Sequence, residues 1–120
     1  GITPQAGRVP LLSTVTGELV DGSGMDAEYW YTNLRETVRL QEAAEALLAD
    51  GYGTFVEVSA HPVLVMAVQE SIEAAGRDAV AFGTLRRHEG GLERLFASLG
   101  EAQVRGVAVD WQSFFAGRDA

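Results

Sequence analysis

The stretch FVEVSAHPVL, residues 55–64, decides the fold class of this 120-residue chain. An apolar, β-branched run leads into a serine, a histidine and a proline, which is typical of a buried strand that turns into a helix. The pattern predicts a strand over 54–59 and a helix that has Pro62 in its first turn and ends at Gly76. In an open α/β sheet, ligands bind beyond the carboxyl ends of such strands.

Strand and helix patterns alternate on both sides of this stretch. The run Val9–Val15 predicts a strand, placed at a sheet edge because Pro10 cannot donate to a ladder. Apolar residues at helical spacing predict helices that close at Gly51 and Gly106, and a third strand is expected over 78–85. This alternation is the signature of parallel sheets. We predict an α/β fold, a partial three-layer parallel sheet with flanking helices, whose remaining strands lie outside the chain.

The connecting segments carry turn signals. Residues 18–24, ELVDGSG, are interpreted as a loop, after which Asp26 is expected to cap a short helix over 27–34. The run RRHEGG, residues 86–91, is interpreted as a surface loop that leads to the last helix. No element is predicted after residue 106.

Composition excludes several classes of function. The net charge of -8 argues against nucleic acid or an anionic membrane as a partner. All nine basic residues are arginine, so no lysine is present for a Schiff base or a phosphate-binding loop. Without cysteine there is no thiolate nucleophile or disulfide. No apolar run approaches the roughly 20 residues that span a bilayer, and no signal-peptide pattern opens the sequence, so a cytoplasmic location is expected.

His61 and Ser59 are the first candidates for chemistry. His61 follows a strand and precedes a helix, which favours function, but it could instead cap the helix or fill space. Ser59 lacks the G-x-S-x-G elbow of a catalytic serine, and no acid is placed to orient the histidine. Ser59 is therefore interpreted as a turn or capping hydroxyl. His61 and His88 share no further ligand at suitable spacing, so no metal site is expected.

A second group of polar residues surrounds the start of the second helix. Arg35 and Arg39 lie within five positions of each other and could together bind a carboxylate or a phosphate, with Asn33 just before them. The alternative is a solvated helix face.

Four blocks of the sequence together resemble a known family. VPLLSTVTGE, AEYWYTNLRETVRL, GYGTFVEVSAHPVL and TLRR are similar, in this order, to the C-terminal part of the acyltransferase domain of modular type I polyketide synthases, which is related to malonyl-CoA:ACP transacylases. The resemblance extends from Pro10 to Trp111. It divides the chain into a C-terminal acyltransferase segment, 1–106, and the start of the post-acyltransferase linker, 107–120.

The resemblance implies a two-step covalent transfer. A malonyl or methylmalonyl extender unit passes from CoA to a serine, with a histidine as general base, and then to the phosphopantetheine of an acyl carrier protein. The family's order places both residues upstream of Gly1, so the chain alone is expected to be inactive and to bind no cofactor. The implied partners are the remainder of the acyltransferase domain and the neighbouring ketosynthase and carrier protein domains, with neither nucleic acid nor membrane.

The resemblance also assigns supporting roles near the active site. His61 matches the histidine of a Ser-Pro-His-Pro-Val-Leu turn, which is not the catalytic base, so it is expected to hold a loop at the wall of the site together with Ser59. Arg39 matches the arginine of the family's Val-Arg-Phe block, in which Leu40 replaces the phenylalanine here, and the resemblance implies that this backbone lies near the catalytic histidine. Asn33 and Arg35 precede the block.

Two alternatives stay open. The chain could be a non-catalytic structural or domain-interaction segment of a megasynthase, which exposed aromatic rings at Trp111, Phe114 and Phe115 would favour. It could also be a small esterase that uses Ser59 and His61, although the elbow and the orienting acid are missing.

Overall fold

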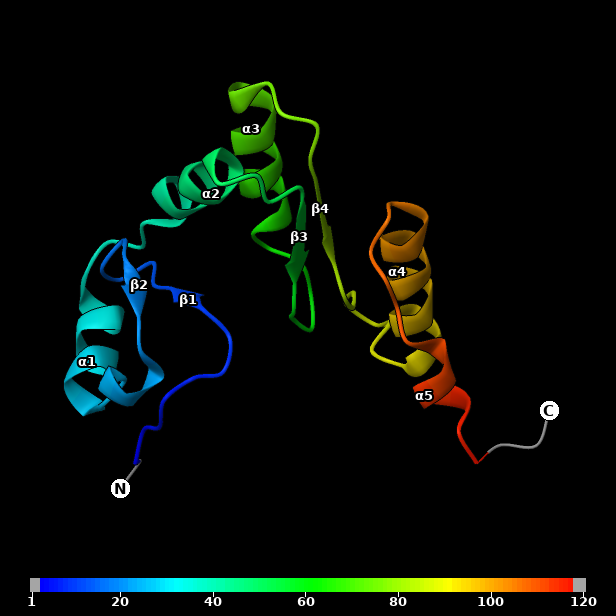
Figure 1. Cartoon of the computed structure of the whole chain (residues 1–120), viewed down its shortest axis with the longest axis horizontal. Coiled ribbons are helices and arrows are strands. Elements are labelled where there is room, and N and C mark those ends of the chain that lie inside the picture. Colours follow the sequence, from blue (N-terminus) through cyan, green and yellow to red (C-terminus); the bar gives the residue numbers. More distant parts are fainter. Residues whose placement is uncertain (1–2, 118–120) are drawn as a thin grey trace. The chain divides into compact units, whose positions relative to one another are not determined.

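The computed structural model describes residues 3–117 (Figure 1). Its elements are β1 (Leu11–Leu12), β2 (Leu19–Val20), the 3-10 helix η1 (Gly22–Gly24), α1 (Ala27–Arg35), α2 (Leu40–Ala49), β3 (Thr54–Glu57), α3 (Val65–Ala75), β4 (Val80–Gly83), α4 (Leu92–Val104) and α5 (Trp111–Phe115). The chain divides into two compact units, and the division runs within α3. The first unit comprises the residues up to 53 and 70–78, and the second comprises 54–69 and the residues from 79 onward.

In the first unit, β1 and β2 form an antiparallel hairpin in which Leu11 lies opposite Val20. The prediction for residues 9–15 is therefore wrong in extent and in partner, because only two residues form a strand and their partner comes from the predicted loop 18–24. The physical reason is a tight reversal of the chain. Gly17 adopts a φ of 75°, a left-handed conformation that glycine takes without a steric penalty.

The helices of the first unit begin and end where local signals predict. Asp26 caps α1, because its Oδ1 accepts the backbone N–H of Glu28 and of Tyr29, each at 3.0 Å. Helix α2 ends before Gly51, whose φ is 91°. The buried apolar residues of this unit come from α2 and the second half of α3: Ala43, Ala44, Leu48 and Ile72.

The second unit is built on a parallel pair of strands. β3 and β4 pair with Thr54 opposite Val80 and Glu57 opposite Gly83. This pairing and the flanking helices confirm the α/β class, although the described residues contribute two strands rather than three to the parallel sheet. The buried residues of this unit are Val68, Phe82, Ser98 and Ala102.

Helix α3 begins later than predicted. It starts at Val65, so Pro62 lies in the loop before the helix rather than in its first turn. The reason is that residues 58–64, called the corner below, are held in an irregular conformation by side-chain hydrogen bonds. The predicted C-terminus is correct, because Gly76 follows α3 with a φ of 60°.

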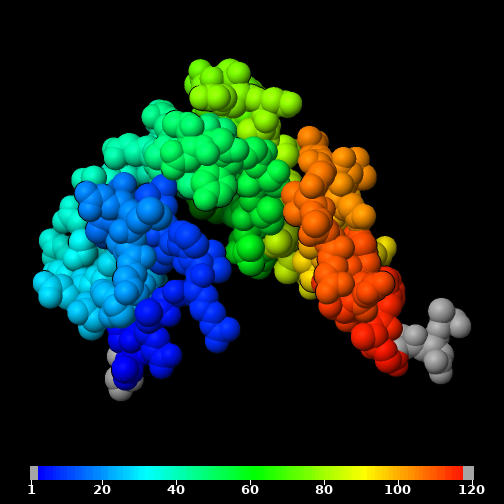
Figure 2. All heavy atoms as spheres, viewed as in Figure 1, coloured from blue at the N-terminus to red at the C-terminus, as the bar shows by residue number. Residues whose placement is uncertain are grey.

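Helix α5 forms where no element was predicted. Asp110 caps it by accepting the N–H of Ser113 at 3.2 Å. The rings of Phe96, Trp111 and Phe114 then pack α5 against α4, with the Phe96 and Phe114 ring centroids 5.4 Å apart in an edge-to-face arrangement. Figure 2 shows the atoms of α4 and α5, orange to red, packed against each other. No described helix is long and apolar enough to cross a bilayer.

Candidate functional site

The corner is held by the side chain of the last residue of β3. The carboxylate of Glu57 accepts the backbone N–H groups of residues 63–65 at distances of 2.8 to 3.1 Å. The hydroxyl of Ser59 lies 3.0 Å from Glu57 Oε1 and 2.9 Å from the carbonyl oxygen of His61. Since a hydroxyl has one proton, these two oxygens share it. The carboxylate thus caps α3 from a strand rather than from the residue that precedes the helix.

Thr84 connects the ends of both strands. Its Oγ1 accepts the N–H of Ser59 at 3.2 Å and lies 3.2 Å from the carbonyl oxygen of Glu57. The buried hydroxyl of Ser98, on α4, donates to the Thr84 carbonyl oxygen at 2.8 Å. The carboxyl ends of β3 and β4 are therefore joined to α4 by uncharged hydrogen bonds, which keep the base of the corner in place.

The pKa of the Glu57 carboxyl is lowered from its ordinary value. Partial burial raises this pKa, but the N–H groups of Val63 and Leu64, the Ser59 hydroxyl and the N–H of Val65 together outweigh burial by stabilising the carboxylate. The start of a helix also favours a negative charge, because its free N–H groups carry a partial positive charge. Glu57 is therefore ionised at neutral pH, as its role as a cap requires.

His61 connects the corner to the loop 86–91. Its Nδ1 accepts the backbone N–H of Arg87 at 3.2 Å, which requires the neutral imidazole with its proton on Nε2. Ser59 bonds to the backbone carbonyl of His61 and to Glu57, so no nucleophile–base pair of Ser59 and the His61 ring forms among the described residues. The esterase alternative gains no support from this geometry, whereas a structural role of both residues agrees with it.

We expect the substitution His61→Ala to accelerate hydrogen exchange at the Arg87 amide about fivefold, because a hydrogen bond of about 1 kcal/mol is lost. The matched variant His61→Asn offers an oxygen acceptor and is expected to retain part of the protection. The amide of Glu89, which donates to the Arg86 carbonyl at 2.9 Å, serves as the internal reference. Unchanged exchange at Arg87 in His61→Ala would contradict the proposed connection.

In the first unit, Arg39 joins the start of α2 to the turn between β1 and β2. Its backbone N–H donates to the carbonyl of Thr14 at 2.9 Å, and its Nη1 donates to the carbonyl of Thr16 at 3.3 Å. Nη1 also lies 4.0 Å from Glu42 Oε2, in an exposed pair that contributes little. A Cβ atom on Gly17 would stand 3.3 Å from Nη1, so the glycine lets the guanidinium approach the turn.

Within residues 3–117, Arg35 and Arg39 have different hydrogen-bond partners. Arg35 donates from Nη1 to the hydroxyl of Tyr31 at 2.9 Å and lies over the same ring. Asn33 lines a hollow beside residues 36–38 that is too small to hold a ligand. Among the described residues, Asn33, Arg35 and Arg39 therefore form no common carboxylate or phosphate site, and their supporting roles stay predictions.

Sequence reasoning missed Ser13 in the first unit and Glu57 and Thr84 at the corner. Ser13 is buried, and its Oγ lies 2.8 Å from the hydroxyl of Tyr29 and accepts the N–H of Val15 at 3.1 Å. Glu57 and Thr84 hold the corner. A serine in a turn and a threonine after a strand have no distinctive pattern, and a glutamate that alternates with valines resembles a solvent-facing charge.

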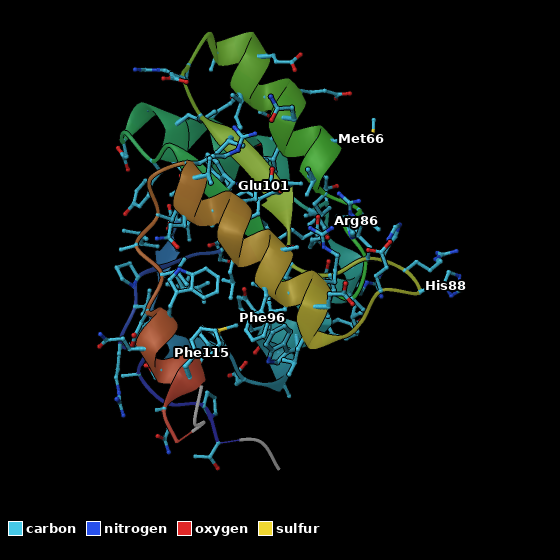
Figure 3. The ribbon with its side chains drawn as sticks, turned by 90° about the vertical axis from the view of Figure 1, so that its right-hand side faces the viewer. Met66, Arg86, His88, Phe96, Glu101 and Phe115 are labelled. Carbon is cyan, nitrogen blue, oxygen red and sulfur yellow. The ribbon has the colours of Figure 1, made fainter. Side chains whose placement is uncertain are left out.

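A separate hollow of about 430 Å³ lies at the start of α4. His88 stands at the outer tip of the loop before this helix (Figure 3) and has a φ of 66°. No group of three side chains suited to a metal ion occurs within residues 3–117. The hollow is lined by His88, Glu89, Gly90, Gly91, Glu93, Arg94 and Ala97.

Comparison with known proteins gives the family. The model of the acyl transferase domain matches residues 1–109, so the chain belongs to this family. Its relatives are modular polyketide synthases, as the four sequence blocks predict. Polyketide synthase GfsA of Streptomyces halstedii is 55% identical over 114 residues, and erythronolide synthase EryA2 of Saccharopolyspora erythraea is 49% identical over 116. These matches cover 95% and 97% of the chain but 2% and 3% of the synthases.

Solved structures agree with this assignment. The acyltransferase domain from module 8 of the salinomycin polyketide synthase matches 94% of the chain with 58% identity and a TM-score of 0.89. A loading acyltransferase from the avermectin modular polyketide synthase matches 88% with 48% identity and a TM-score of 0.76. The chain spans 27% and 31% of these two structures. It is thus a part of a polyketide synthase acyltransferase domain.

Proposed function

We propose that this chain forms the C-terminal part of an acyltransferase domain that moves a malonyl-type extender unit from CoA to the phosphopantetheine of an acyl carrier protein. The observation that carries the proposal is the agreement in sequence and fold with the salinomycin acyltransferase domain, at 58% identity and a TM-score of 0.89. The reaction is a covalent two-step transfer. Among the residues described, the chain supplies scaffold rather than nucleophile, since the Ser59 hydroxyl is directed to Glu57 and to a backbone carbonyl.

The proposed contribution of the chain is a wall of the substrate site. The corner lies at the carboxyl ends of β3 and β4, where ligands of α/β proteins bind. Ser59 and His61 hold this corner, while Arg39 holds the turn between β1 and β2. Asn33 and Arg35 belong to the helix before Arg39. These five residues are proposed as supports of the site, not as reacting groups.

The proposed partners follow from the length of the relatives. Because the chain matches only 2% of GfsA, acyltransferase domains of this kind sit with other domains in one long protein. We propose the remainder of the acyltransferase domain, the ketosynthase domain and the acyl carrier protein as the partners. Residues from 107 onward are proposed to begin the linker, of which 118–120 lie outside the described residues.

The test compares the intact acyltransferase domain with the chain alone. Each is incubated with malonyl-CoA or methylmalonyl-CoA and with holo carrier protein, and the acylated species are identified by intact mass. We expect an acyl-enzyme and a loaded carrier protein from the intact domain, and neither from the chain. No acylation of the intact domain by either thioester would overturn the proposed function. A stable adduct on Ser59 of the chain, absent from Ser59→Ala, would instead show that the chain carries a nucleophile.

A second candidate function is a docking segment within the synthase. The observation that favours it is Phe115 on α5, which is 55% exposed (Figure 3). The half-buried Trp111, which packs against Phe96, weakens the same case because part of the aromatic cluster is already covered. Quenching of Trp111 fluorescence by acrylamide in the chain and in the intact synthase distinguishes the two functions, since docking would lower quenching further in the synthase.

A further inference from the structure

The carboxylate of Glu57 is saturated with hydrogen bonds. Oε1 accepts the N–H of Val63 at 2.9 Å and faces the Ser59 hydroxyl at 3.0 Å. Oε2 accepts the N–H groups of Leu64 and Val65 at 2.8 and 3.0 Å, and lies 3.1 Å from the N of Val63. A carboxylate offers about four acceptor positions, so each is in use. Both oxygens of this side chain are therefore used to hold Ser59 and residues 63–65.

Residues 60–64, directly before α3, offer no substitute for this side chain. Ala60, Val63 and Leu64 carry no polar side chain, and Pro62 has no N–H. The Nδ1 of His61 is already occupied by the N–H of Arg87. Without Glu57, the first N–H groups of α3 would have to find water or leave the helix. The junction of the corner with α3 therefore depends on a single charged side chain.

The other side of the corner rests on the end of β4. A Cβ atom on Gly83 would stand 2.9 Å from the Cβ of Pro62, so the proline ring lies directly against the strand. Thr84 binds the backbone of Ser59 next to it. The corner is thus fixed at its base by packing and uncharged hydrogen bonds, and at its junction with α3 by Glu57. The carboxylate of Glu57 therefore fixes the conformation of residues 63 and 64, the part of the corner next to α3.

We propose that Glu57 is a positioning residue for acyl transfer, whose carboxylate holds the corner, residues 58–64, in the conformation that forms a wall of the substrate site. The proposal rests on the proposed function. Glu57 does not touch the reacting atoms in this role. It acts through the backbone of residues 63–65 and through the hydroxyl of Ser59.

The substitution Glu57→Gln isolates this role because it preserves the size of the side chain. The amide keeps one acceptor oxygen, but its NH₂ group faces backbone N–H groups that are also donors. At least one of the N–H groups of residues 63–65 then loses its partner, and the corner relaxes. Since displacement of about 1 Å at a substrate site can cost up to about 100-fold in rate, we expect kcat of the intact domain to fall about tenfold or more. KM for the acyl-CoA is expected to change less than kcat.

The matched control is Asp110→Asn, in the same unit. Asp110 is also a carboxylate that caps a helix, and its pKa is also lowered, by hydrogen bonds from the side chain and the backbone of Ser113. It does not lie at the end of a parallel strand. We expect kcat of this variant to stay within about twofold of the wild type, since capping by asparagine is nearly equivalent to capping by aspartate.

The experiment measures kcat and KM for acyl-CoA in the intact acyltransferase domain, with thermal unfolding recorded for each variant. A folded Glu57→Gln variant with wild-type kcat would overturn the proposal, and so would an equal loss in Asp110→Asn. If Glu57→Gln does not fold, Ser59→Ala is the second test. It removes the contacts of the hydroxyl with Glu57 Oε1 and with the carbonyl oxygen of His61, and leaves the N–H groups of residues 63–65 on the carboxylate. A fall in kcat of about threefold is then expected, and wild-type kcat would overturn the proposal. An inactive wild-type domain would instead refute the proposed function, and the inference with it.

Discussion

We expect the substitution Phe82→Ala to lower the free energy of unfolding of the domain by about 3 to 5 kcal/mol. Phe82 lies in β4 and is 7% exposed, and it is the buried aromatic residue of the second unit among the residues described. Removing the ring loses the free energy that is gained when the ring is buried away from water. It also leaves a cavity that the two-stranded sheet can fill only in part. Urea unfolding of the intact domain, followed by circular dichroism, measures the change.

The control for this substitution keeps most of the volume. Phe82→Leu is expected to cost less than about 1.5 kcal/mol, because swaps between large apolar side chains are tolerated when the core repacks. Equal losses for alanine and leucine would mean that ring shape, rather than buried volume, stabilises this site. A loss below 1 kcal/mol for alanine would contradict the burial of Phe82.

We expect Gly83→Ala, at the end of the same strand, to destabilise the domain by about 1 to 3 kcal/mol through overpacking. The new Cβ would stand 2.9 Å from the Cβ and 3.2 Å from the Cγ of Pro62, so the proline must move. Because Pro62 belongs to the corner, the same substitution is expected to reduce acyl transfer in the intact domain. Thermal unfolding and kcat together check the two expectations.

Gly100→Ala is a matched glycine-to-alanine substitution that is expected to change stability in the opposite direction to Gly83→Ala. Gly100 lies within α4, and no described atom outside its own helix stands within 4 Å of a Cβ built there. Alanine is expected to stabilise the helix by about 0.5 to 1 kcal/mol, because glycine loses more backbone entropy on folding. If both variants shifted stability in the same direction, contact with Pro62 would not be the cause of the Gly83 effect.

The elements that sequence reasoning located well are those with local causes. Asp26 begins α1, and glycines with positive φ follow α2, α3 and α4 at 51, 76 and 106. A cap or a left-handed residue acts on the few residues beside it, so its effect can be recognised in the sequence. The family resemblance rests likewise on contiguous blocks of residues. It was confirmed by the match of the acyl transferase domain model to residues 1–109.

The elements that sequence reasoning misplaced depend on partners distant in the chain. Residues 9–15 have a strand-like composition whatever they pair with, and only the reversal at Gly17 makes the pair antiparallel. The helix α5 is five residues long, and its docking on α4 requires Phe96, which lies 15 or more positions before it. Isolated helices of this length are not stable in water, so tertiary packing decides whether they form.

For the candidate site, the sequence by itself determined that a strand leads into a turn at Ser59 and His61 and that a helix follows. The extent of the corner was not determined, because residues 58–59 were expected in the strand and Pro62 in the helix. The sequence also did not determine what holds the corner. Glu57 alternates with valines as a surface charge would, yet its carboxylate caps a helix that begins eight residues later. Only the tertiary structure decided this role, because a hydrogen bond between residues separated in the chain depends on how the backbone folds back between them.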